Sequence, residues 1–136
     1  MDASLEEVVT HYDDVKGTDK VNDTNGTMLF NGTQFDITLS KGTGTLNKNG
    51  TNHIRVQKNN SLTIAATGGK KIVSITFIAT TTSYVDELQA FLTANGYTHT
   101  TDGLEVTINV DSLETVTLNN TAGKIARIAT VQIAYI

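Results

Sequence analysis

The chain has 136 residues and a formal net charge of −4, and it contains no cysteine, tryptophan or proline. This length suits one domain with a real core, and the acidic balance argues against a nucleic-acid backbone or an anionic membrane as the main partner. The missing cysteines exclude a disulfide framework, a thiolate zinc site and a cysteine nucleophile, and no apolar run is long enough to insert into a membrane.

The polarity of the chain comes from threonine and asparagine rather than from charge. Threonine occurs 24 times and asparagine 12 times, while Asp, Glu, Lys and Arg together make up 18%. Threonine favours strands, and Asn and Gly favour turns. This composition is typical of secreted or cell-surface β-modules of bacteria. We expect residues 1–136 to be a single, monomeric module of a larger exported protein, extracellular or on the cell surface; a cytoplasmic protein is the alternative, because Met1–Glu7 does not resemble a signal peptide.

The first fifteen residues fit two local structures. Apolar residues recur at helical spacing from Leu5 to Tyr12, whereas Val8–Tyr12 equally has the propensity of a strand. The sequence leaves both open, and the polar segment 16–27 that follows is predicted to be a loop.

Alternating apolar and polar residues predict strands along most of the remaining chain. We place them at residues 28–30, 35–39, 53–57, 61–65, 71–79, 97–101, 104–110, 113–118 and 125–136. Asp102-Gly103 is a strong signal for a two-residue hairpin turn. The last run changes parity, which predicts a β-bulge near Ala129-Thr130.

One helix is predicted at about residues 83–95. Ser83 is the expected N-cap, with Asp86 and Glu87 in the first turn, and Asn95-Gly96 is the expected stop. The apolar stripe at helical spacing consists of Val85, Leu88, Phe91 and Leu92. Short strands with regular turns and one short helix together predict an all-β fold, a jelly-roll-like antiparallel β-sandwich.

Two stretches of the chain carry a resemblance. They are the hairpin Ser61–Phe77, with its Gly68-Gly69 turn, and the final run Ile125–Tyr135. Together with the Ser-Tyr-plus-helix element Thr82–Leu88, they resemble a loose group of β-sandwich accessory modules in secreted and surface proteins of gut and rumen bacteria. The resemblance covers roughly residues 28–136, and its motifs are turns and core strands.

The resemblance implies a non-catalytic role, since many such modules look like carbohydrate-binding modules. It supplies no ligand residues to transfer. The chain departs from the usual sugar-binding pattern because it has no Trp, the residue with the largest face for stacking on a pyranose ring. This departure argues against crystalline cellulose or chitin, and leaves polar recognition of a soluble or acidic glycan open.

The first functional hypothesis is therefore a module that binds a polysaccharide or glycan and does no catalysis. The candidate ligand-binding residues are Tyr97 for stacking, on an exposed hairpin, and His53, Arg55 and Asn52 as hydrogen-bond partners. Tyr84 and Tyr135 are expected in the core. The second hypothesis is a structural spacer or adhesin domain that binds a protein partner or no ligand.

Three weaker patterns bear on ligands. Six of the ten basic residues fall within 31 positions, and they either form a basic face for uronic-acid or sulfated glycans or protect edge strands from pairing. An acidic group before Asn25 either holds a structural calcium ion or is a solvated loop. No histidine lies at metal-ligand spacing from another, and no nucleophile motif is present, so we expect no cofactor and no enzyme activity. The basic residues are Lys41, Lys48, Arg55, Lys58, Lys70 and Lys71; the acidic residues are Asp13, Asp14, Asp19 and Asp23.

Overall fold

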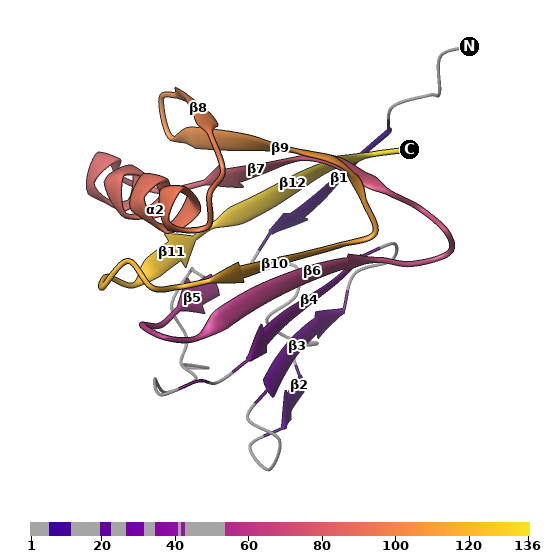
Figure 1. Cartoon of the computed structure of the whole chain (residues 1–136), viewed down its shortest axis with the longest axis horizontal. Helices are drawn as coiled ribbons and strands as arrows, with labels where there is room; N and C mark the ends of the chain where they lie inside the picture. Colours follow the sequence, from indigo (N-terminus) through magenta and orange to yellow (C-terminus); the bar gives the residue numbers. More distant parts are fainter. Residues whose placement is uncertain (1–5, 12–19, 23–26, 32–34, 41, 43–53) are drawn as a thin grey trace.

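A computed structural model describes residues 6–11, 20–22, 27–31, 35–40, 42 and 54–136. This part of the chain forms two five-stranded antiparallel sheets, with a two-stranded ribbon and one helix at one end (Figure 1). The first sheet has the order β1 (Glu6–His11), β12 (Thr130–Tyr135), β7 (Ile72–Ile78), β9 (Glu105–Leu113), β8 (His99–Asp102). The second has the order β10 (Thr115–Asn119), β6 (Ser61–Ala66), β4 (Phe35–Ser40), β3 (Thr27–Asn31), β2 (Lys20–Asn22). The ribbon pairs β11 (Ala126–Ile128) with β5 (Ile54–Val56).

Consecutive strands repeatedly change sheets. A turn with Gly68 and Gly69 at positive φ leads from β6 to β7, and Glu114 alone links β9 to β10. Because the first and last strands, β1 and β12, are also neighbours, the chain winds as a jelly-roll-like sandwich. The structure thus confirms the predicted all-β sandwich with one short helix.

The core lies between the two sheets and follows from strict alternation. In β4, Phe35, Ile37 and Leu39 are at most 2% exposed, while the residues between them are half-buried. The same alternation runs from Ser61 to Ala65 in β6 and from Glu105 to Asp111 in β9. A slip of one residue would turn each of these apolar sets to solvent, so the apolar pattern itself fixes the register.

Threonine covers much of the outward surfaces. Thr63 of β6 and Thr117 of β10 lie opposite each other with their hydroxyl oxygens 3.2 Å apart. Thr76 of β7 and Thr107 of β9 form a closer pair at 2.8 Å on the other sheet. Cross-strand hydroxyl pairs of this kind stabilise a sheet modestly while keeping its face polar.

The helix is α2 (Thr82–Ala94), and its buried stripe is the predicted one, Val85, Leu88, Phe91 and Leu92. Its predicted N-cap is wrong. Thr81 is the cap, with an extended backbone and its Oγ1 accepting from the Tyr84 N–H at 3.4 Å. Ser83 lies within the first turn, with its hydroxyl oxygen 3.0 Å from Thr81 Oγ1. Asp86 and Glu87, which were expected in the first turn, consequently lie beyond it.

The N-terminal choice between helix and strand is resolved in favour of the strand. β1 pairs with β12 from Glu6 opposite Tyr135 to His11 opposite Thr130. This ladder satisfies backbone groups of β12 that would otherwise form an open sheet edge. Pairing with a distant strand, rather than the helical spacing of the apolar residues, therefore determines the local structure.

One predicted loop, one turn and one strand differ from the structure. The segment 16–27, predicted to be a loop, contains β2 and ends at the first residue of β3. The loop of the hairpin between β8 and β9 is Gly103-Leu104 rather than Asp102-Gly103, since Asp102 pairs with Glu105. The predicted long final strand is two strands, β11 and β12, which belong to different sheets. They part at Ala129, whose N–H donates to Ile78 O at 2.9 Å. The change of parity there marks a passage between sheets, not a bulge within one.

A buried asparagine joins the loops on either side of the ribbon. Asn120 is 0% exposed, and its side-chain amide donates to Val56 O at 2.8 Å and to Lys124 O at 2.7 Å. Its backbone exchanges hydrogen bonds of 2.8 Å with the loop that follows β5, at Asn59 and Asn60. One residue thereby fixes the start of β11 against the end of β5.

We predict that Asn120→Asp destabilises the fold by about 3 kcal/mol or more. The substitution is nearly isosteric, but it places a carboxylate against carbonyl oxygens that the amide now satisfies, and it buries a charge without a partner. The midpoint of chemical denaturation measures the loss. Asn109→Asp, the same change at an exposed position of β9, is the control and should shift stability by less than about 0.5 kcal/mol.

Candidate functional site

The ribbon places two arginines directly opposite each other. Arg55 of β5 and Arg127 of β11 are register partners in the antiparallel pair. Their neighbours along both strands are buried, whereas the two arginines are half-buried. Opposed residues in a ladder project from the same face, so both side chains leave the ribbon on its outer side.

Arg127 contacts the helix through one terminal nitrogen and through the face of its guanidinium. Its Nη1 donates to both carboxylate oxygens of Glu87, at 2.8 and 3.1 Å. The guanidinium carbon lies 4.8 Å from the centroid of the Tyr84 ring, a cation–π distance. The Arg127 and Glu87 side chains are 21% and 17% exposed, so water screens the ion pair only in part. α2 therefore holds Arg127 in one orientation.

Arg55 is not engaged in this way. Its Nε is buried and has no hydrogen-bond partner, and among the described residues no carboxylate forms an ion pair with it. A desolvated donor without an acceptor costs free energy, and a like charge directly opposite adds to that cost. Among the described residues, the two arginines therefore share one contacting carboxylate, that of Glu87.

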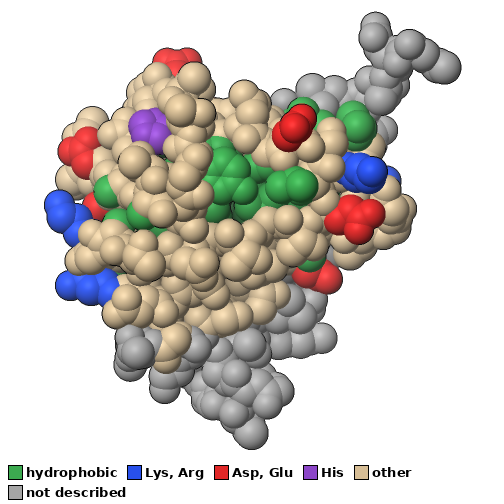
Figure 2. All heavy atoms as spheres, viewed as in Figure 1, with side chains coloured by type: hydrophobic (Ala, Val, Ile, Leu, Met, Phe, Trp, Pro, Cys, Tyr) green, Lys and Arg blue, Asp and Glu red, His purple; other side chains and the backbone are tan. Residues whose placement is uncertain are grey.

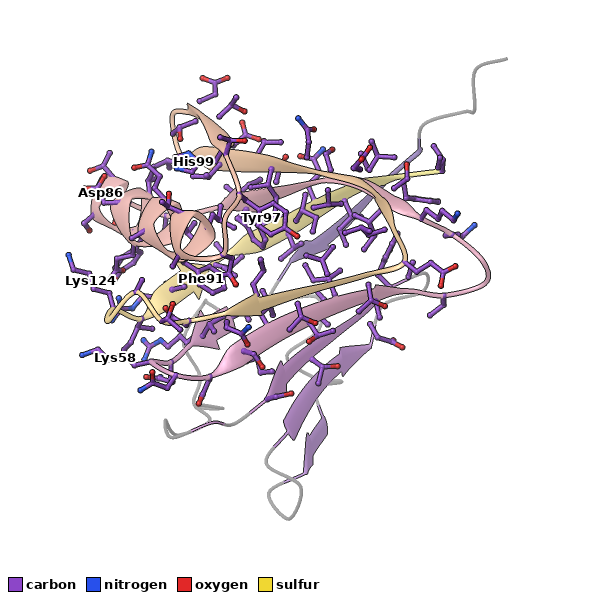
Figure 3. All side chains as sticks on the ribbon, viewed as in Figure 1. Lys58, Asp86, Phe91, Tyr97, His99 and Lys124 are labelled. Atoms are coloured by element: carbon purple, nitrogen blue, oxygen red, sulfur yellow. The ribbon has the colours of Figure 1, made fainter. Side chains whose placement is uncertain are left out.

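Two lysines extend the positive charge around the ribbon. Lys58 and Lys124 are exposed and lie on the two loops that Asn120 ties together. Figure 3 shows both side chains reaching out at the same end of the molecule, with Asp86 of α2 also at that end. We call Arg55, Lys58, Lys124 and Arg127 the basic end.

The basic end differs from the grouping that the sequence suggested. Lys70 and Lys71 follow the turn after β6, at the opposite end of the sandwich (Figure 1), and Lys70 Nζ lies 5.2 Å from the centroid of the Tyr135 ring. Figure 2 shows Lys and Arg side chains gathered at two opposite ends of the viewed face. Lys41 and Lys48, like the acidic group considered for calcium, lie outside the described residues.

Of the four residues proposed as ligand-binding, the structure describes two. Arg55 lies in the basic end. Tyr97 is half-buried, follows the C-terminal end of α2 and packs against the core, so it is less exposed than the hairpin prediction required. Figure 3 shows it on the link between α2 and β8. His53 and Asn52 lie outside the described residues.

The aromatic ring that contacts the arginine pair is that of Tyr84, through Arg127, rather than that of Tyr97. Arg127, the partner of Arg55, contacts Tyr84 at the start of α2, and Tyr97 follows the other end. The helix rises 1.5 Å per residue, so about 15 Å separates Tyr84 from Ala94 along the axis. Tyr135 is in the core as expected, at 3% exposed. Tyr84 is half-buried and packs against the core.

Sequence reasoning missed Arg127, Lys124 and Glu87 as members of this site. From the sequence, Arg127 was named only as part of the final run Ile125–Tyr135, whose motif is structural. The only available signal was an Arg at the centre of a short apolar alternation, Ala126-Arg127-Ile128, which mirrors Ile54-Arg55-Val56. That two such triplets pair with each other is a long-range fact that no local pattern contains.

No family model, curated protein or solved structure matches the chain. The described part of the chain has no helix with the length and apolar character to span a membrane. Within the same residues, no three His, Asp or Glu side chains gather as metal ligands would. The basic end is therefore the candidate site on the strength of its own geometry.

We predict that Glu87→Gln destabilises the protein by about 1–2 kcal/mol, because it removes the counter-charge of a partly buried arginine. In an Arg55→Met background the same substitution should cost about 0.5–1 kcal/mol less, since one of the two facing cations is gone. A double-mutant cycle in urea measures this coupling. Asp86→Asn, at the exposed neighbouring position, is the control. Equal losses in the two backgrounds would show that Arg55 does not sense the Arg127–Glu87 pair.

Proposed function

We propose that the chain is a non-catalytic carbohydrate-binding module that targets a parent protein to a polysaccharide or glycan. The observation that carries the proposal is the state of Arg55, a half-buried guanidinium at the surface whose Nε has no acceptor. Sugars are rich in oxygen acceptors, and arginine presents a planar set of donors to them. Nε itself is enclosed by the protein, so a ligand would bind through the terminal nitrogens of Arg55, which form no ion pair among the described residues.

The surroundings of Arg55 add two kinds of support. Tyr84 and Arg127 form a rigid stacked pair beside it, so a bound sugar would meet a preorganised surface and lose little side-chain entropy there. The likeness to accessory modules of carbohydrate-active proteins, noted from Ser61–Phe77 and Ile125–Tyr135, points to the same class of ligand. The partial exposure of Tyr97 leaves it as a separate candidate for stacking on a sugar ring.

A structural spacer or adhesin domain is the second candidate. The hydroxyl pairs Thr63–Thr117 and Thr76–Thr107 cover central positions of the two sheets. Sheet faces covered by short polar side chains suit a domain that stays soluble and separates other domains without binding a ligand. This candidate needs no role for the basic end.

We predict that native affinity electrophoresis through pectin, xylan, β-glucan, starch and mucin retards the folded protein in at least one of these gels. Tyr97→Leu, which keeps apolar bulk but removes the flat ring, should weaken the retardation several-fold if Tyr97 stacks on the sugar. Leu113→Ala removes an exposed apolar side chain (42% exposed) and is the control for non-specific adhesion.

Running the same gels with EDTA tests for a calcium requirement, because carboxylate-held calcium is removed by the chelator. Unchanged migration in every polysaccharide, with a native circular dichroism spectrum, would contradict the carbohydrate-binding function and leave the spacer or adhesin domain.

A further inference from the structure

The charge balance of the basic end is incomplete. Arg55 and Arg127 face each other across the β11–β5 pair, and Glu87 is the only carboxylate that contacts either guanidinium among the described residues. Lys58 and Lys124 add two further cations on the adjoining loops, and Asp86 of α2 adds one carboxylate at the same end (Figure 3). This concentration of positive charge occurs in a chain whose formal net charge is −4.

Such a pair is unfavourable in the isolated protein. Like charges directly opposite each other in a ladder repel, and the enclosed Nε of Arg55 has given up water without gaining an acceptor. An aliphatic side chain at position 55 would avoid both costs, because it carries neither a charge nor a hydrogen-bond donor. The arrangement costs stability that a bound anion would return.

We infer that the basic end binds an anionic group of a glycan, the carboxylate of a uronic acid or a sulfate ester, between Arg55 and Arg127. This inference rests on the proposed function and deepens it by naming the ligand class. The carboxylate of Glu87 already shows how an anion sits on Arg127, and a ligand anion would supply the equivalent partner for Arg55. Guanidinium groups suit both anions because their donors match the spacing of paired oxygens.

The preorganisation of the site fits this assignment. α2 fixes Arg127 through Glu87 and Tyr84, and the Asn120 hydrogen bonds fix β5 relative to β11. Lys58 and Lys124, at the rim, would attract an acidic polymer over a longer range, an effect that added salt weakens.

The test compares charged and neutral versions of the same polymer. De-esterified polygalacturonate is set against fully methyl-esterified pectin, and dextran sulfate against dextran, with mixed-sequence duplex DNA as a non-glycan polyanion. We expect one charged glycan to retard the protein at concentrations at least about tenfold lower than its neutral counterpart, with weaker retardation at higher salt. Which charged glycan is bound distinguishes a carboxylate from a sulfate ester.

Variants locate the effect. Arg55→Met should weaken retardation by the charged glycan about tenfold or more, and Lys71→Met, which removes the same charge from an exposed position at the far end, should leave it unchanged. Arg55→Met should also keep or raise the melting temperature of the free protein, whereas an arginine with only a structural role would lower it. The charged glycan should raise the melting temperature of the wild type but not of Arg55→Met. Arg55→Lys, which keeps the charge and loses the planar donor set, should bind several-fold more weakly.

Each contrary result is informative. Equal retardation by charged and neutral glycans would overturn the anionic ligand and leave the proposed function standing. Equal effects of Arg55→Met and Lys71→Met, or binding of DNA as strong as that of the glycan, would show that binding is unspecific charge attraction. Either result would overturn the inferred anion site. Absence of binding to every polysaccharide would remove the proposed function together with this inference.

Discussion

The hydrogen bonds of the buried Asn120 amide are the interaction on which the arrangement at this end of the sandwich depends. β11 and β5 are three residues each, too short to hold each other in place alone. The side chain of Asn120 bonds to carbonyl oxygens at the end of β5 and just before β11, and so its burial replaces the ladder that the short strands lack. The positions of Arg55 and Arg127 follow from this link, because the register of the ribbon places them opposite each other.

Stability and function make opposite demands on the arginine pair. The fold stabilises Arg127 by an ion pair and a ring contact and gives Arg55 neither. Proteins commonly keep such unfavourable groups where a ligand uses them, and the cost is met by the remainder of the core. Here the apolar inner faces of two five-stranded sheets supply that core, so a loss of roughly 1 kcal/mol from opposed like charges is tolerable within the total stability of a domain of this size.

The sequence predicted the elements well and their partners poorly. Alternation located most of the strands, though not β2, and helical spacing located α2, because both signals arise from neighbouring residues and one buried face. The displaced N-cap, hairpin turn and final strand are different, since each depends on contacts made elsewhere. Ala129, for example, ends β11 because its N–H bonds to Ile78 in the first sheet. Of the candidate site, Arg55 was named from the sequence, but Arg127 and Glu87 reach it from 72 and 32 positions further along the chain, beyond the range of any local pattern.

The same distinction explains why Tyr97 and Arg55 appeared suitable as one site and lie apart in the structure. Each was selected for the chemistry of its side chain, which the sequence shows directly. Their separation is set by α2, which places Tyr84 at one end and Tyr97 beyond the other. The aromatic ring that accompanies the arginine pair is therefore Tyr84, already covered on one side by Arg127. An arginine that occupies the tyrosine face leaves charge rather than stacking as the main means of recognition at the basic end, which agrees with a chain that contains no Trp.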